Sequence, residues 1–95
     1  MAYQIVYHPL VMEEDLPAVN RNLQVRIVRA IEQRLSTEPT LYGEPLRHRL
    51  KGFWRLRVGD YRVIYHMVDE KVLIVTVGHR KEIYTMPFQR FLWRP

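Results

Sequence analysis

The sequence contains no cysteine, and none of its apolar runs is long enough to form a transmembrane helix. Without thiols the chain can form neither a disulfide nor a thiolate metal site, and its histidines and carboxylates are not spaced as metal ligands are. We therefore expect no metal and no cofactor. The first ten residues, MAYQIVYHPL, lack the positively charged segment of a signal peptide, so we expect a cytoplasmic protein with no membrane partner.

Glycine is also scarce, with four residues in 95, and the glycine-containing motifs of two enzyme classes are missing. There is no glycine-rich phosphate-binding loop and no G-x-S-x-G elbow, which argues against the P-loop NTPases and the α/β-hydrolases. The hydrophobic content of 47% is that of a globular protein. At this length we expect a single domain, residues 1–95, with one modest core.

What the sequence has in excess is positive charge. Fifteen lysines and arginines stand against ten acidic residues, which gives a net charge of +5 and a pI near 9.9, and twelve of the fifteen are arginine. Residues 46–65 hold six of these basic side chains and one acidic side chain, Asp60. Such a patch is typical of a protein that binds a polyanion, with nucleic acid as the first candidate. The alternative is a solvated surface with ordinary ion pairs.

The predicted elements follow the order strand, helix pair and three-strand meander. Alternating or β-rich runs predict strands at residues 3–8, 54–58, 61–67 and 71–77. Apolar residues at every fourth position from Val19 to Leu35 predict an amphipathic helix that begins at Pro17. A short helix over residues 10–15 precedes it, because Pro17 disfavours helical geometry at Leu16. This order predicts an α+β fold: a small, largely antiparallel sheet, made of the N-terminal strand and the C-terminal three-strand meander, with the two N-terminal helices packed on one face.

Three further stretches carry expectations. Residues 40–45 are predicted to be a loop, and the run LRHRL at residues 46–50 places basic side chains between two apolar anchors. The tail, residues 86–95, is too rich in apolar side chains to be left exposed, so we expect it to dock on its own sheet or against a partner. The face of the sheet away from the helices is expected to be partly open to solvent.

The stretch FWRLRVGDYRVIY, residues 53–65, predicts a β-hairpin with a two-residue turn at Gly59 and Asp60. This turn places Arg57 opposite Arg62, with Arg55 on the same face, while the apolar side chains occupy the other face. Like charges directly opposite each other destabilise a strand pair.

Three converging guanidinium groups require an anion between them. A phosphate suits this role, because the planar fork of arginine matches its oxygens. The alternative is that Asp60, Glu82 or Glu44 neutralises the cluster, or that the arginines splay into water.

The stretch GHRKEIY follows the last predicted strand and adds polar groups at its end. Gly78 permits an unusual turn or a close approach of another chain segment. His79, Arg80 and Lys81 can then join the arginine surface, and Tyr84 follows shortly after. A lone histidine or tyrosine is more often structural than catalytic, so each residue by itself is a weak indication.

Taken together, EPLRHRLKG, WRLRVGDYRVIY and VGHRKEIY resemble the RelE/ParE superfamily of toxins from type II toxin–antitoxin pairs, and the RelE branch in particular. Members of that branch cut mRNA in the ribosomal A site. The ParE branch shares the fold but poisons DNA gyrase and lacks the nuclease residues. The resemblance thus implies a ribosome-dependent endoribonuclease, with a ParE-like gyrase inhibitor as the alternative. A non-toxic basic RNA-binding module is a third reading that no specific feature supports.

The resemblance also implies roles for individual residues. Arg57, Arg62, Arg80 and Tyr84 match catalytic positions, at which arginines stabilise the transition state and a tyrosine orients the mRNA or transfers a proton. We expect RNA contacts from Arg47, Arg49, Lys51, Arg55, His79 and Lys81. The expected chemistry is metal-independent attack of the ribose 2′-OH on the adjacent phosphate, with arginine stabilisation of the phosphorane. The expected partners are an antitoxin, which makes a hetero-oligomer with the toxin, and mRNA on the ribosome.

One departure from the family pattern leaves a role unassigned. Arg55 and Arg57 stand where the founding members carry lysines, and arginine cannot lose its proton in a protein. A lysine general base therefore cannot be carried over. His48, His66, His79 and Tyr84 are the remaining candidates for the proton acceptor.

Overall fold

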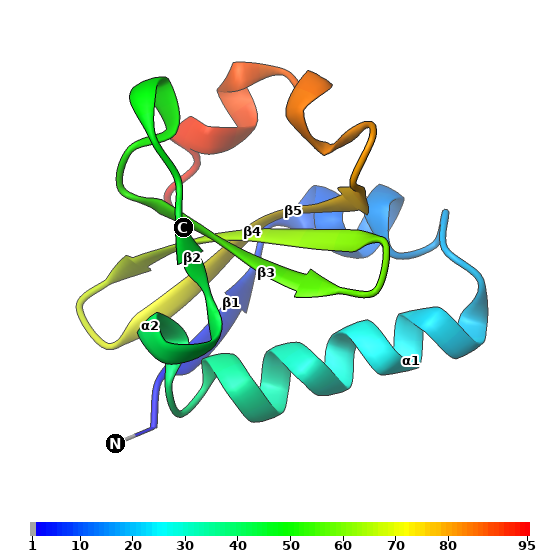
Figure 1. Cartoon of the computed structure of the whole chain (residues 1–95), viewed down its shortest axis with the longest axis horizontal. Coiled ribbons are helices and arrows are strands. Elements are labelled where there is room, and N and C mark those ends of the chain that lie inside the picture. Colours follow the sequence, from blue (N-terminus) through cyan, green and yellow to red (C-terminus); the bar gives the residue numbers. More distant parts are fainter. Residues whose placement is uncertain (1) are drawn as a thin grey trace.

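A computed structural model describes residues 2–95 and contains a five-stranded sheet with helical segments on both faces (Figure 1). The strands are β1 (Gln4–Tyr7), β2 (Glu44–Pro45), β3 (Phe53–Val58), β4 (Tyr61–Val68) and β5 (Lys71–His79). The helices are α1 (Arg21–Ala30) and α2 (Pro39–Tyr42), with short helical turns at Val11–Asp15, Ile31–Leu35, His48–Leu50, Ile83–Thr85 and Phe88–Leu92. None of the helices in this described part is both long and apolar enough to cross a bilayer.

The sheet has the order β1-β5-β4-β3-β2 and is mostly antiparallel. Only β1 runs parallel to its neighbour β5, while β2–β3, β3–β4 and β4–β5 are antiparallel. A parallel pair needs a long crossover connection, and here the connection includes the helices. The predicted α+β class, with a largely antiparallel sheet, is confirmed.

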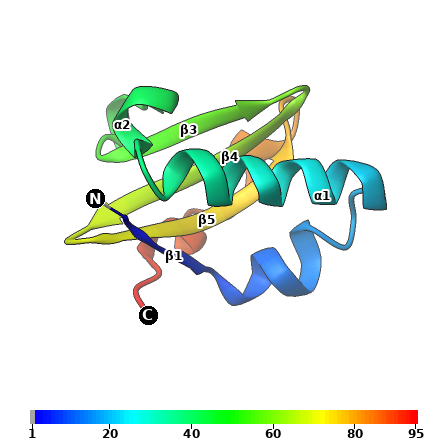
Figure 2. The ribbon, with the colours of Figure 1, turned by 90° about the horizontal axis from the view of Figure 1, so that it is seen from below.

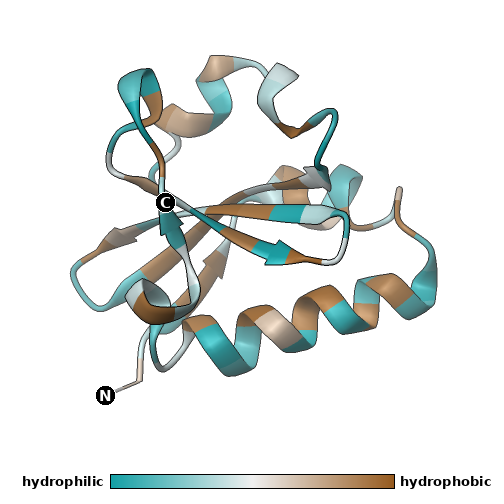
Figure 3. Cartoon of the chain, viewed as in Figure 1, coloured by the Kyte–Doolittle hydropathy of each residue, from teal (hydrophilic) through white to brown (hydrophobic). Residues whose placement is uncertain are grey.

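Helix α1 and the turn at Val11–Asp15 cover one face of the sheet, as the sequence predicts (Figures 1 and 2). The turn Ile31–Leu35 follows α1 directly, and Ile27, Ile31 and Leu35 are fully buried. Figure 3 shows the corresponding alternation of hydrophobic and hydrophilic bands along this helix. The main core therefore lies between α1 and the sheet. It contains Val11, Leu16, Val19, Ile27, Ile31, Leu35, Leu56, Val58, Val63, Tyr65, Val72, Ile74 and Val77.

The prediction that the long helix begins at Pro17 is wrong, because α1 begins at Arg21. Asn20 has an extended backbone, and its Oδ1 accepts a hydrogen bond from the Leu23 N–H at 3.0 Å. Asparagine is among the best N-cap residues. The cap therefore sets the start of the helix, and Pro17 lies in the turn before it.

The C-terminal segment packs on the opposite face of the sheet (Figure 1). Phe91 lies edge-on to Phe53, with ring centres 5.4 Å apart, and Ile83 is fully buried. This second core consists of Phe53, Ile64, Val75, Ile83 and Phe91, with Leu46 and Leu50 packed against it. The tail docks on its own sheet, which confirms one of the two alternatives predicted for it. The face of the sheet away from α1 is therefore more covered than expected.

A buried ion pair ties the tail to the first helical turn. The Arg90 guanidinium donates from Nη1 to Asp15 Oδ2 at 2.8 Å and from Nη2 to Asp15 Oδ1 at 3.3 Å. The same Oδ2 accepts the Val77 N–H at 2.9 Å. The tie therefore joins the first helical turn, β5 and the tail at one point.

The predicted loop at residues 40–45 is instead α2 followed by the short strand β2. Glu44 pairs with Arg55 of β3, and Pro45 with Trp54. Gly43 allows this close approach, because a Cβ atom at Gly43 would lie 1.7 Å from the hydroxyl oxygen of the buried Tyr65. The consequence for the site is that β2 carries Glu44 to the side of β3.

Candidate functional site

The hairpin of β3 and β4 has the register that the two-residue turn predicts. The pairs are Val58 with Tyr61, Arg57 with Arg62, Leu56 with Val63, and Arg55 with Ile64. Gly59 has a φ of +60°, a left-handed value that glycine adopts at no steric cost. Since Leu56, Val58 and Val63 face α1, the alternating arginines face the other side. We call the surface formed by Arg55, Arg57, Arg62, Glu44 and Tyr84 the arginine face.

Glu44 supplies the carboxylate that separates the arginines. Its Oε1 lies 2.9 Å from Arg57 Nε and 3.5 Å from Arg55 Nη2. Of the three acids considered from the sequence, this is the one that pairs with Arg55 and Arg57. The carboxylate is half-exposed, so an exposed pair of this kind stabilises the fold only slightly. Three arginines against one carboxylate leave the arginine face positively charged.

Arg62 is oriented by the backbone of the hairpin turn. Its Nη1 donates to the carbonyl oxygens of Gly59 at 2.9 Å and Tyr61 at 3.0 Å. These contacts hold its guanidinium group at the hairpin turn. The remaining donors of Arg62 are free of protein partners in the described residues.

Tyr84 joins the arginine face through Arg55. Arg55 Nη1 donates to the Tyr84 hydroxyl oxygen at 2.5 Å. This hydrogen bond is the main reason that the pKa of Arg55 is raised; burial opposes the rise, and Glu44 adds to it. Arg55 Nε is buried without a hydrogen-bond partner, and an orphaned donor of this kind costs about 1–3 kcal/mol.

The position of Tyr84 depends on a close contact at Gly78. Ile83 is fully buried, and its Cδ1 lies 3.2 Å from the place that a Cβ atom would take at Gly78. The absence of a side chain at Gly78 therefore allows Ile83 to approach β5 closely, which is one of the two roles predicted for this glycine. As a result the Ile83–Thr85 turn packs against the end of β5. Tyr84 itself is about half-exposed and available to a ligand.

Arg80 is attached to the same hairpin turn. Its backbone N–H donates to the Asp60 carbonyl at 2.8 Å, and its Nε lies 3.6 Å from Asp60 Oδ1. Arg62 pairs with Gly78, two residues before Arg80. The structure therefore brings Arg57, Arg62 and Arg80 to one end of the sheet.

The expectation that His79 joins the arginine surface is wrong. His79 pairs with Tyr61, and the two rings meet edge to face with centres 5.5 Å apart. Its Nδ1 accepts the Lys81 N–H at 3.2 Å. His79 thus lies on the α1 side of the strand end, and a role in RNA binding stays a prediction that this placement does not favour.

The basic loop before β3 lies at the opposite end of the strand from Arg57. Arg47, Arg49 and Lys51 are exposed beside the start of β3, whereas Arg57 lies near its end. Four residues of a strand span about 13 Å. The Arg49 guanidinium carbon lies 5.1 Å from the centre of the Phe88 ring, which ties this loop to the tail. RNA contacts from these residues, and from the exposed Lys81, stay predictions.

The histidines do not supply a proton acceptor at the arginine face. His66 Nδ1 is 2.9 Å from the Gly52 carbonyl oxygen and its ring packs on Phe53, at the far end of β4. His48 belongs to the exposed turn before β3. Glu44 is therefore the group on the arginine face that can accept a proton, a role the sequence did not suggest because a two-residue strand has no recognisable periodicity.

The family model that matches this chain describes toxins, and two similar proteins are toxins as well. Residues 5–84 match the family model described as ParE toxin of the type II toxin–antitoxin system parDE. Toxin RelG of Mycobacterium tuberculosis is 46% identical over 72 residues, which cover 74% of this chain and 83% of RelG. The mRNA interferase toxin RelE of Escherichia coli K12 is 31% identical over 78 residues, which cover 78% of each chain.

Solved structures show the same fold. The toxin–antitoxin complex RelBE2 from Mycobacterium tuberculosis contains a chain that superimposes with a TM-score of 0.78 at 32% identity. The match covers 84% of this chain and 93% of that one.

Proposed function

Because this chain belongs to the RelE/ParE superfamily of type II toxins and is RelE-like, we propose that it is a ribosome-dependent endoribonuclease that cuts mRNA in the A site. The observation that carries the proposal is the arginine face. There Glu44 pairs with both Arg55 and Arg57, and Arg55 donates to Tyr84. Arg62 lies directly opposite Arg57 across the hairpin. The relative from Escherichia coli that is named an mRNA interferase supports it.

The chemistry follows from the charges that the reaction creates. Attack of the ribose 2′-OH on the adjacent phosphorus breaks the bond to the 5′-oxygen and forms a 2′,3′-cyclic phosphate. Negative charge builds up on the non-bridging oxygens of the phosphorane, and preorganised arginines stabilise it. Arg57 and Arg62 supply this charge from the hairpin, and Arg80 supplies it from the end of β5.

Proton transfer falls to the two groups that are not arginine. Glu44 takes the proton of the 2′-OH, and Tyr84 gives a proton to the leaving 5′-oxygen. For Glu44 to act, the substrate phosphate must replace the carboxylate between Arg55 and Arg57, which frees Glu44 to face the ribose. The ribosome contributes by holding the mRNA in the geometry of in-line attack.

The test uses ribosomes programmed with an mRNA of defined A-site codon, with cut sites mapped by primer extension. The wild-type chain should cut within the A site, and Arg62→Ala and Arg80→Ala should each lower the single-turnover rate about 10²- to 10³-fold. Arg94→Ala is the matched control, because Arg94 is exposed in the tail and, among the described residues, donates only to the Trp93 carbonyl. Wild-type rates in both arginine variants would refute the proposed mechanism.

A second candidate function comes from the family model, whose description names a ParE toxin. In that case the chain would inhibit DNA gyrase as a binding protein and would leave mRNA intact. Gyrase cleavage complexes that accumulate with the wild-type toxin, in the absence of A-site cuts, would establish this alternative and exclude the first.

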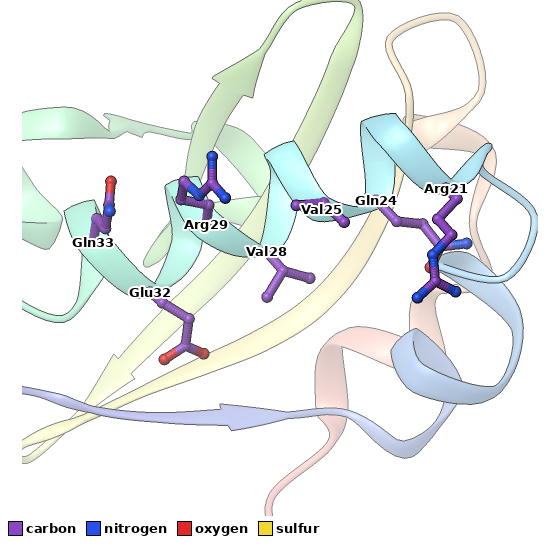
Figure 4. A pocket seen from close by; sticks show the side chains of 7 residues that line it. All are labelled: Arg21, Gln24, Val25, Val28, Arg29, Glu32 and Gln33. Atoms are coloured by element: carbon purple, nitrogen blue, oxygen red, sulfur yellow. The ribbon is translucent and has the colours of Figure 1, made fainter.

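The proposed protein partner is an antitoxin, since the similar chain from Mycobacterium tuberculosis is part of a toxin–antitoxin complex. One flank of α1 offers an open hollow of about 470 Å³ (Figure 4). Val25 at its centre is 47% exposed, and Val28 lies one turn further along. Apolar side chains of an antitoxin segment would cover these two valines.

Substitution of Val25 by aspartate should weaken antitoxin binding at least tenfold in calorimetric titrations and leave mRNA cleavage by the free toxin intact. Lys71→Asp, an exposed change at the start of β5, is the control. Equal affinities for the two variants would exclude this flank as the antitoxin site.

A further inference from the structure

A second cluster of arginines lies between α1 and the free edge of β3. It surrounds a cavity of about 190 Å³, which is lined by Arg26, Arg29, Ala30, Gln33, Arg34, Arg57, Val58 and Gly59. Strand β2 pairs with β3 only at Trp54 and Arg55, so the edge of β3 beyond them faces this cavity. Arg57 also belongs to the arginine face, so the two basic surfaces adjoin each other.

The arginines of α1 and of the Ile31–Leu35 turn that follows it have no carboxylate partner among the described residues. In the described part of the chain, neither Arg26, Arg29 nor Arg34 forms an ion pair with a carboxylate. Arg26 lies against the hairpin turn, since its Nη1 is 3.7 Å from the place that a Cβ atom would take at Gly59. In Figure 4, Arg29 points away from the side of α1 that carries Glu32.

This arrangement differs from the arginine face in one respect. There, Glu44 lies between two of the guanidinium groups, whereas here the guanidinium groups share a cavity without an acid. Arg26, Arg29 and Arg34 are exposed, so water screens part of their mutual repulsion, and an anion from outside would neutralise what is left. A cavity of this size admits a phosphate group, and arginine binds phosphate oxygens through two parallel hydrogen bonds.

The spacing along the helix indicates a polymer with repeated charges. Residues 26 to 34 of a helix span about 12 Å, and a nucleic acid strand carries one phosphate per 3–4 Å of its axis, about 3.4 Å in duplex DNA. The cavity is lined mainly by polar groups, and its apolar members, Ala30 and Val58, are already buried in the core. A protein segment would find few apolar anchors there, in contrast to the adjoining hollow with Val25 and Val28, which shares Arg29 and Gln33 with the cavity.

We propose that Arg26 and Arg29 of α1, with Arg34 of the turn that follows it, form a second phosphate-binding site, which holds the backbone of structured RNA rather than the strand that is cut. We call these three arginines the α1 site. The inference rests on the proposed function, because the structured RNA is that of the particle that presents the mRNA. The arginine face acts on the scissile phosphate, and the α1 site holds the toxin in place. Loss of the α1 site therefore raises KM, whereas loss of Arg62 lowers kcat.

The first experiment measures binding of the full-length chain to a fluorescently labelled RNA hairpin with a 20-base-pair stem, across a series of KCl concentrations. The double variant Arg26→Gln/Arg29→Gln should bind at least tenfold more weakly, with a salt slope reduced by about one for each lost phosphate contact. The control is Lys71→Gln/Arg94→Gln, which removes the same charge from exposed sites elsewhere. Thermal melts of all three proteins exclude unfolding as the cause.

The second experiment measures mRNA cleavage on programmed ribosomes. We expect the double variant to raise KM about tenfold and to change kcat by less than twofold relative to the control. If the double variant and the control bind RNA with the same affinity, the α1 site would be refuted and the proposed nuclease function would be unaffected. If the double variant binds the RNA hairpin more weakly than the control but the wild type cuts no mRNA, the α1 site would stand and the proposed nuclease function would be refuted. Weaker antitoxin binding with unchanged RNA binding would overturn the proposal in favour of an acidic peptide ligand.

Discussion

At the residue scale, the difference between arginine and lysine decides how the site can work. Arginine holds its charge at every accessible pH, so Arg55 and Arg57 can bind a phosphate and stabilise a phosphorane but cannot take a proton. In the proposed mechanism the proton acceptor must therefore be a different residue, and Glu44 is the candidate on the arginine face. Glu44 therefore has two possible roles: it accepts a proton, or it only neutralises the arginines.

Glu44→Gln distinguishes these two readings. If Glu44 accepts the proton, the amide variant should lower the single-turnover cleavage rate on ribosomes about 10²- to 10⁴-fold, because an amide cannot act as a base. RNA affinity should rise or stay the same, since a negative charge has left the arginine face. An unchanged cleavage rate together with tighter RNA binding would show that Glu44 serves only as a counter-charge.

His8 gives a prediction for the pH dependence of stability. Its ring packs on Trp93 at 4.9 Å, and its Nδ1 accepts the Leu10 N–H at 2.9 Å. Burial lowers the pKa of His8, and the charge of Arg90 lowers it further, while Asp15 acts in the opposite direction. The folded state therefore binds this proton less well than the unfolded chain does.

The free energy of unfolding should thus fall as the pH drops below the unfolded-state pKa of about 6.5 and toward the lower folded-state value. Urea unfolding at pH 7.5, 6.5 and 5.5 measures this change. In His8→Asn the same pH series should show a smaller fall, because the asparagine can accept the Leu10 N–H without titrating. Parallel pH dependences in the two proteins would contradict the assignment to His8.

At the scale of elements, the sequence predicted those features that a local rule determines. The hairpin register followed from a two-residue turn, which fixes every pair beyond it. The start of α1 was misplaced because two signals compete within four residues, and the cap at Asn20 overrides Pro17. The side on which His79 lies was not predictable, because the apolar run of β5 does not alternate and a bulge opposite Ile64 and Tyr65 shifts its register.

Strand β2 shows why the site was harder to predict than the fold. Two residues carry no periodicity, and Glu44 reaches Arg57 only because the chain passes Tyr65 at close range. Contacts between segments far apart in the sequence decide such positions, and a single sequence does not display them.

Gly43→Ala tests this dependence of the site on an element contact. The added methyl group would overlap the Tyr65 hydroxyl group, which donates a hydrogen bond to the Pro39 carbonyl. Such overpacking should lower the free energy of unfolding by about 1–3 kcal/mol. Displacement of β2 should also lower the cleavage rate.

The double variant Gly43→Ala/Tyr65→Phe serves as its control, since it removes the hydroxyl group that the methyl group meets. We expect it to recover part of the lost stability in urea unfolding. Equal stabilities of the wild type and Gly43→Ala would show that β2 moves freely past Tyr65.

At the scale of the whole molecule, two cores lie on opposite faces of one sheet, and a buried ion pair fastens the outer segments together. Asp15 comes from the first helical turn and Arg90 from the tail, and both are more than nine-tenths buried. A buried pair of this kind is weak evidence for net stabilisation, but removal of one partner leaves an uncompensated charge. The tie therefore makes the two ends of the chain depend on each other.

Asp15→Asn should lower the free energy of unfolding by about 3–5 kcal/mol, because it leaves the buried Arg90 guanidinium without a counter-charge. Glu14→Gln, an exposed change one residue away, is the matched control and should have little effect. Urea unfolding gives both values. Asp15→Asn/Arg90→Gln should recover part of the loss, and a double variant less stable than Asp15→Asn would contradict the ion-pair explanation.

The tie between Asp15 and Arg90 also has a consequence for synthesis of the protein. The N-terminal half of a growing chain already contains the carboxylate, but its guanidinium partner follows 75 residues later. Until then Asp15 has no buried counter-charge, and the second core lacks Phe91. A nascent chain that does not yet include residues 90 and 91 should therefore lack its finished structure. We expect the toxin to acquire its activity only after Arg90 and Phe91 have joined the fold, when an antitoxin already present can meet a complete surface.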